Sequence, residues 1–138
     1  MKSRKILIAC QDDSCASKLS DIFHGVEMVK TVSDMIRQVK NARFQVIVLD
    51  EEVEGIKATD LVPIVKKLNP KTQIVAISSE GSIESARRLR GAGIFYQAMK
   101  PIEIDEITSA VSCAFDKIER ENLSEGFFSF LRPNLVPA

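Results

Sequence analysis

The stretch Gln45-Val-Ile-Val-Leu-Asp50 decides the fold, because an apolar run typical of a buried strand ends directly in a carboxylate. Two later apolar runs also end in a polar side chain, one in Ser78 and the other in Lys100, which Pro101 follows. The carboxyl ends of parallel strands meet at one edge of an open α/β sheet, where ligands bind. A nucleophile, a hydroxyl and a cation are what capture of a phosphoryl group requires. We therefore expect Asp50, Ser78 and Lys100 to form one site for an anionic group.

Strand-like runs alternate with helix-like segments along most of the chain. Each apolar run is followed by a segment whose apolar residues recur at helical spacing. The expected strands lie near residues 5–10, 26–32, 44–49, 72–77 and 94–99. Five such units, with strands apolar on both faces, predict an α/β fold with a doubly wound five-stranded parallel sheet in a single domain.

The last segment is different in composition. The helical period after residue 104 is clear, and we expect it to be broken at Asn122-Leu-Ser-Glu-Gly126. The aromatic cluster that follows is Phe127, Phe128, Phe130 and Leu131. Exposing that much aromatic surface gains little, so we expect the cluster to pack on its own domain, on a second copy in a homodimer, or on a partner. The sequence thus predicts a domain over residues 1–120 and a tail over residues 121–138.

Composition excludes several functions. The 138 residues include 19 basic and 19 acidic side chains, so no global field favours direct binding to nucleic acid or to a membrane surface. The single histidine and three cysteines without CxxC spacing indicate no clustered metal site and favour a reducing compartment. No apolar stretch approaches the ~20 residues of a membrane span, and the run after the basic start is too short for a signal peptide. We expect a cytoplasmic protein.

At this point the chain resembles the receiver domain of two-component response regulators over about residues 4–119. The resemblance rests on Asp50, Ser78 and Lys100-Pro101 at successive strand ends, with Asp105-Glu106-Ile107 opening the last helix. It implies a sheet of order 2-1-3-4-5, with Asp50 as phosphoacceptor, Ser78 as switch hydroxyl and Lys100 as the cation that pairs with phosphate. It also implies a cis peptide before Pro101, Mg²⁺ beside the aspartate, a histidine kinase or phosphotransfer protein as donor, and a downstream protein partner.

The first strand departs from the family pattern. Cys10 and Gln11 occupy the two positions where receivers usually carry a pair of acids that holds Mg²⁺. A thiol and a neutral amide are poor ligands for this hard cation. We therefore expect weak Mg²⁺ binding through Asp50, with charge supplied by Asp12 or Glu52.

Two further points remain open at the sequence level. An alternative register would place Asp12 and Asp13 at the acid-pair positions, but it would misalign Leu19 on the first helix. Position 97, usually an aromatic residue that moves with the switch, is Gln97. We also expect removal of Lys100 to cost little stability, on the view that a site lysine is exposed.

Two functions fit these observations. The first is a receiver that accepts phosphate on Asp50 and signals through Ser78 and Lys100 to a protein partner, with self-phosphorylation and slow self-dephosphorylation as its only chemistry. The second is a pseudo-receiver, an interaction module that is not phosphorylated because Cys10 and Gln11 replace the acid pair. A third reading, an enzyme on the same sheet, lacks both a glycine-rich phosphate loop and a histidine base near a nucleophile.

Overall fold

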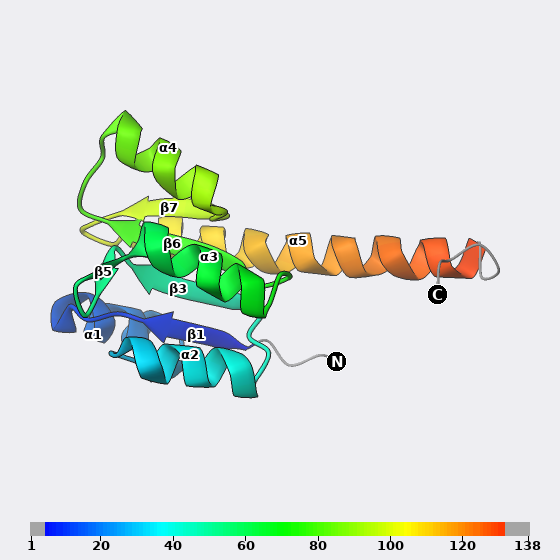
Figure 1. Cartoon of the computed structure of the whole chain (residues 1–138), viewed down its shortest axis with the longest axis horizontal. Helices are drawn as coiled ribbons and strands as arrows, with labels where there is room; N and C mark the ends of the chain where they lie inside the picture. The colour runs from blue at the N-terminus through cyan, green and yellow to red at the C-terminus, as the bar shows by residue number, and fades with distance from the viewer. Residues whose placement is uncertain (1–4, 132–138) are drawn as a thin grey trace.

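The computed structural model describes the backbone of residues 5–131 and the side chains of residues 5–125. A five-stranded parallel sheet lies between two layers of helices (Figure 1). Its strands, in the order in which they lie side by side, are β2 (Glu27–Val29), β1 (Ile6–Ala9), β3 (Val46–Asp50), β6 (Gln73–Ser78) and β7 (Tyr96–Met99). Counted along the chain, this is the order 2-1-3-4-5, so the predicted fold class is confirmed. A two-stranded antiparallel hairpin, β4 (Glu52–Val53) with β5 (Ile56–Lys57), follows β3 along the chain.

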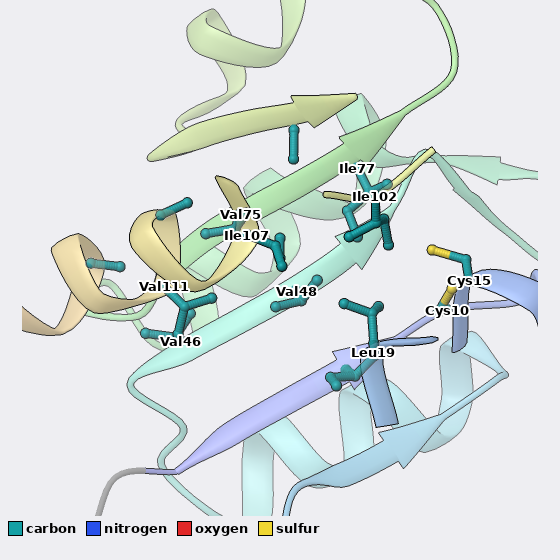
Figure 2. Packing of buried hydrophobic residues seen from close by; sticks show 14 of the residues in the cluster. Cys10, Cys15, Leu19, Val46, Val48, Val75, Ile77, Ile102, Ile107 and Val111 are labelled. Carbon is teal, nitrogen blue, oxygen red and sulfur yellow. The ribbon is translucent and has the colours of Figure 1, made fainter. Parts of the chain in front are cut away.

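Alternate residues of each central strand point to opposite faces of the sheet, and each face has its own core. The helices are α1 (Asp13–Ile22), α2 (Val32–Asn41), α3 (Ala58–Leu68), α4 (Ile83–Ala92) and α5 (Ile104–Leu131). On one face, Val46 and Val48 of β3 join Leu19 of α1 and Ile107 of α5, as Figure 2 shows. On the other face, residues such as Ile47 of β3 pack with buried side chains of α2, α3 and α4. Both faces of β3 are therefore covered, which is why its sequence is apolar without alternation.

The C-terminal end of α5 differs from what the sequence predicts. The expected helix break over residues 122–126 is wrong, because α5 runs without interruption to Leu131 and crosses the boundary expected between residues 120 and 121. Glycine in a helix costs only about 1 kcal/mol relative to alanine, so Gly126 alone does not end it. The signal that favours continuation is the spacing of Leu123, Phe127 and Phe130, which is i, i+4, i+7. The packing of the aromatic cluster lies outside the described side chains.

The far part of α5 projects beyond the sheet (Figure 1). An exposed ion pair, Lys71 Nζ to Glu125 Oε2 at 2.9 Å, connects it to the turn before β6. Leu123 on this part has 76% of its surface exposed. Within residues 5–131, no helix is both long and apolar enough to cross a membrane.

Candidate functional site

Three strand ends meet at one edge of the sheet, as the sequence predicts. Asp50 is the last residue of β3, Ser78 is the last residue of β6, and Lys100 directly follows β7. Parallel pairing of β3 with β6, and of β6 with β7, places these ends next to one another. Asp50 Oδ1 lies 2.9 Å from Lys100 Nζ, and the peptide bond before Pro101 is cis. The structure thus brings the carboxylate and the cation into direct contact.

Both oxygens of the Asp50 carboxylate accept hydrogen bonds although the side chain is only 3% exposed. Oδ1 accepts from the Glu51 amide at 2.8 Å as well as from Lys100. Oδ2 accepts from the Cys10 thiol and from the Asp12 amide, each at 3.4 Å. A buried carboxylate is costly unless it is paired and hydrogen-bonded, and here it is both.

Lys100 is shared among three carboxylates. Besides Asp50, its Nζ lies 3.3 Å from Asp12 Oδ2 and 3.6 Å from Glu51 Oε1. Burial alone would lower the pKa of Lys100, but the hydrogen bond and charge of Asp50, with Asp12 and Glu51, raise it above its ordinary value. The ammonium is therefore charged throughout the neutral range and holds the acidic cluster together.

Asp12 has a structural role in addition to its contact with Lys100. It is the N-cap of α1, and its Oδ1 accepts from the amides of Ser14 at 3.0 Å and Cys15 at 3.4 Å. The Cys15 amide and the lysine lower the pKa of Asp12. Asp13, the other candidate of the alternative register, instead forms an exposed ion pair with Lys30 at 2.6 Å. The contact of the Cys10 thiol with Asp50 agrees with the register that places Cys10 and Gln11 at the two acid-pair positions.

Ser78 lies at the predicted edge, but its hydroxyl is engaged elsewhere. Its Oγ donates to the Glu80 carbonyl and accepts from the Glu80 amide, both at 3.1 Å. The side-chain nitrogen of Gln97, Nε2, donates to the same carbonyl at 3.4 Å. In this conformation Ser78, the loop after β6 and Gln97 form one connected group beside the Asp50–Lys100 pair.

Glu51 is the site residue that the sequence analysis missed. Its carboxylate accepts from the Ser79 amide at 3.0 Å and the Ser79 hydroxyl at 2.8 Å, and it faces Lys100. Glu52, which the sequence suggests as a charge donor, is exposed on β4. The only signal for Glu51 in the sequence is its place directly after Asp50, in an acidic run that offers several candidates.

The side chains present do not fit Mg²⁺. Cys10 brings a thiol that donates to Asp50, and the Gln11 side-chain oxygen accepts from the Glu54 amide. Among residues 5–125, no group of three or more histidine, cysteine, aspartate or glutamate side chains is arranged to hold a metal ion. The expected set of Asp50, Asp12 and Glu52 is therefore not assembled as a hard-oxygen cage.

Cys10 and Cys15 share a side-chain hydrogen bond in the interior beside the site. That bond, together with burial and the Asp50 carboxylate, raises the pKa of the Cys10 thiol well above its ordinary value. The same bond lowers the pKa of Cys15. Cys10 therefore remains a protonated donor to Asp50.

The acidic group around Lys100 predicts a pH-dependent effect of Glu51→Gln. Burial alone would raise the pKa of Glu51, but the Ser79 amide and hydroxyl and Lys100 bring it below its ordinary 4.5. A lowered folded-state pKa adds stability that is present above the unfolded-state pKa and is lost as pH falls through the folded-state value. We expect Glu51→Gln to lower the unfolding free energy at neutral pH by less than about 1 kcal/mol, and by progressively less at acid pH.

Urea unfolding at about pH 7 and about pH 3 measures this difference. Glu52→Gln is the matched control, since it removes a neighbouring but exposed acid and should change little. An equal loss for Glu51→Gln at both pH values would contradict the ionic role.

Comparison with known proteins places this arrangement in a family. A model of the response regulator receiver domain matches residues 10–112. The DNA-binding transcriptional regulator NtrC of Azospirillum brasilense is 25% identical over 120 residues, which are 84% of this chain and 25% of that protein. NtrC of Bradyrhizobium sp. (strain RP501 Parasponia) is 22% identical over 118 residues, with 83% of this chain covered. The chain spans about a quarter of the length of these curated relatives.

Solved structures share the fold. A receiver domain protein described as CheY-like, from Methanospirillum hungatei JF-1, superposes with a TM-score of 0.79 at 21% identity, covering 87% of this chain and 99% of that one. The beryllofluoride-activated NtrC4 receiver domain dimer gives a TM-score of 0.77 at 22% identity, covering 84% and 99%. At these identities the likeness concerns the fold alone.

Proposed function

This chain belongs to the response regulator receiver domain family, and from that premise we propose that it accepts a phosphoryl group on Asp50 and passes the signal to a protein partner. Receiver domains are signalling modules of two-component systems that receive phosphate from histidine kinases or phosphotransfer proteins. The observation that carries the proposal is the 2.9 Å contact between Asp50 Oδ1 and Lys100 Nζ at the carboxyl edge of the sheet. This contact places the proposed nucleophile, Asp50, beside Lys100, the cation that would stabilise the negative charge of the acyl phosphate.

The proposed reaction is transfer from a phosphohistidine. A carboxylate oxygen of Asp50 attacks phosphorus, the new O–P bond forms as the P–N bond breaks, and the leaving imidazole nitrogen takes up a proton from solvent. The acyl phosphate carries a charge of roughly −2 at neutral pH. Asp12 and Glu51 repel that charge while Lys100, already central to the acidic cluster, offsets it.

Ser78 is the proposed link from chemistry to conformation. To donate to the phosphoryl group its hydroxyl must leave the Glu80 carbonyl, which then retains the Gln97 amide as a donor. The loop after β6 would move with the hydroxyl. In this proposal Gln97 replaces the usual aromatic residue with a polar connection to the same loop.

The proposed partners follow from the family and the charge. A histidine kinase or phosphotransfer protein supplies the phosphoryl group, and a downstream protein reads the changed surface in the cytoplasm. Direct contact with nucleic acid or membrane is not part of the proposal, because basic and acidic residues balance at 19 each.

Intact mass spectrometry tests the proposal. The chain is incubated with a small phosphodonor, with and without Mg²⁺, and one phosphoryl group should add to the wild type and not to Asp50→Asn. No addition to the wild type from either a small donor or a histidine phosphotransfer protein would reject it.

One observation favours the second function, a pseudo-receiver that is recognised without phosphorylation. Asp50 is already satisfied by Lys100, two amides and the Cys10 thiol, so the unmodified state is stable without added charge. Two results together would establish this function instead. A partner would bind the wild type and Asp50→Asn with equal affinity, and the wild type would take up no phosphoryl group.

We propose that residues 1–120 are the receiver module and that residues 121–138 make a contact between two copies. Leu123 is exposed on the projecting part of α5, and the aromatic residues recur on the same helical spacing. An exposed apolar surface of this kind is typical of a site where another protein surface binds. The solved NtrC4 receiver is described as a dimer, which supports the same assembly for this chain.

Truncation after Glu121 is expected to convert the dimer to a monomer with little change in melting temperature. Within the described residues the removed segment is tied to the domain by the exposed Lys71–Glu125 pair, worth at most about 1 kcal/mol. Sedimentation velocity over a concentration series measures the change. Glu125→Gln, which breaks the ion pair and leaves the helix complete, should stay dimeric. A truncated chain that sediments as the full chain does would reject the tail contact.

A further inference from the structure

Two buried thiols lie in contact beside Asp50, and the phosphoacceptor role requires neither of them. Cys10 directly follows β1, and Cys15 is in the first turn of α1. Figure 2 shows their sulfur atoms close together at the edge of the core, and both residues belong to the same buried cluster. We propose that Cys10 and Cys15 are an oxidation site that forms an intramolecular disulfide.

The geometry favours this bond over a static role for either thiol. The loop and helix start between the two residues are held by Asp12, whose carboxylate caps α1 and contacts Lys100. The two side chains are packed in one cluster, so a disulfide requires their sulfur atoms to approach to about 2.05 Å. Cys113, the third cysteine, is exposed on α5 and is not in this core cluster.

Access distinguishes the two sulfurs. Cys15 lines a surface hollow together with Lys18, Lys100 and Ile102, whereas Cys10 is only 1% exposed and does not line that hollow. The positive charges of Lys18 and Lys100 in the same hollow favour the thiolate of Cys15, which is the form that reacts with an oxidant. Cys15 is therefore the thiol that reacts first, and Cys10 is the thiol that resolves it.

With hydrogen peroxide as oxidant the steps balance. The Cys15 sulfur attacks one peroxide oxygen, the O–O bond breaks, and Cys15 sulfenic acid and water form. The Cys10 thiol passes its proton toward Asp50 Oδ2, to which it donates, as its sulfur attacks the Cys15 sulfur; the S–O bond breaks, and the leaving hydroxide takes that proton and departs as a second water. Two thiols are oxidised by two electrons in all, and a dithiol reductant reverses the reaction.

Oxidation changes the site directly. Cys10 without its hydrogen cannot donate to Asp50 Oδ2, which then keeps the Asp12 amide as its donor on that oxygen. The disulfide thus alters the surroundings of the carboxylate without altering its pairing with Lys100.

The test uses the full chain with Cys113→Ser, which removes the exposed thiol and leaves the core unchanged. After treatment with hydrogen peroxide, the protein is denatured, alkylated with a maleimide and weighed. We expect loss of both maleimide adducts, a mass lower by two hydrogens, and a cross-linked peptide that contains Cys10 and Cys15. Two retained adducts, under conditions that oxidise an unfolded control of the same chain, would overturn the proposal.

Two further variants in that background check the order of reaction. Cys10→Ser should trap sulfenic acid on Cys15, detected with a carbon-acid reagent such as dimedone. Cys15→Ser should leave Cys10 reduced, because the Cys10 side chain is only 1% exposed. Sulfenic acid on Cys10 of folded Cys15→Ser protein, with circular dichroism unchanged, would overturn the assigned roles.

Discussion

Lys100→Ala is expected to abolish phosphorylation of Asp50 and to lower the unfolding free energy by about 1 to 3 kcal/mol. The first effect follows because the acyl phosphate would form among Asp12 and Glu51 with no cation at 2.9 Å to offset it. The second follows because Asp50, 3% exposed, would remain buried with amide and thiol donors but without its charged partner. The sequence suggests a smaller cost, since it treats the lysine as exposed, whereas its side chain is only 19% exposed.

Phosphodonor labelling followed by intact mass measures the chemistry, and urea unfolding measures the stability. The double variant Lys100→Ala with Asp50→Asn should regain part of the lost stability and remain unlabelled, which separates the ionic cost from loss of the reaction. Lys18→Ala is the matched control, because Lys18 lines the neighbouring hollow and donates to the Ile102 carbonyl without touching Asp50. Labelling of Lys100→Ala to the wild-type extent would show that the lysine has no part in the site.

Cys10→Asp combined with Gln11→Asp is expected to turn a poor Mg²⁺ site into a good one. The wild type should not saturate in the low-millimolar range, because a thiol and an amide occupy the two acid positions. The double variant should bind at least about tenfold more tightly, since one carboxylate is added against Asp50 and a second at the adjoining position 11. Without metal it should be less stable by about 0.5 to 3 kcal/mol, because a second carboxylate replaces the thiol that now donates to Oδ2 at 3.4 Å.

Added Mg²⁺ should reverse that loss, by about 2.7 kcal/mol at a concentration one hundred times the dissociation constant. Calorimetric titration gives the affinity, and melting temperature against Mg²⁺ concentration gives the linkage. Cys10→Ser with Gln11→Asn changes the same positions without charge and should behave as the wild type does. If the acidic variant binds no better than this control, the position of Cys10 as the first acid of the family pattern is wrong.

The parts of the fold that the sequence predicts correctly are those fixed by burial on both sides. The four residues before Asp50, from Val46 to Leu49, are all apolar because β3 is covered on both faces, so the segment is predicted as a central strand without any knowledge of its neighbours. The order of the sheet follows from the family resemblance that the strand-end residues support. The contact of Asp50 with Lys100 is likewise predictable, because both follow strands at the same edge.

Other parts depend on forces that are weak or local. The choice of Glu51 over Glu52 depends on the direction of the backbone where the chain passes from β3 into β4, because neighbouring side chains point to different sides there. The bond between Ser78 and Glu80 is one rotamer among several for a hydroxyl. The length of α5 depends on whether one glycine outweighs the helix-forming residues around it, a balance of about 1 kcal/mol.

The continuous α5 has a mechanical consequence. It begins just after Lys100 and Pro101 and continues to Leu131, and Ile118 is its last residue in the core among the side chains of residues 5–125. At about 1.5 Å per residue, the segment beyond Ile118 is a lever of roughly 20 Å. A tilt of about 5° at the sheet would move the end of such a lever by roughly 2 Å. A tilt of α5 that is too small to open the domain would therefore displace its far end by a larger distance. In a dimer joined through these ends, that displacement would change the alignment of the two copies.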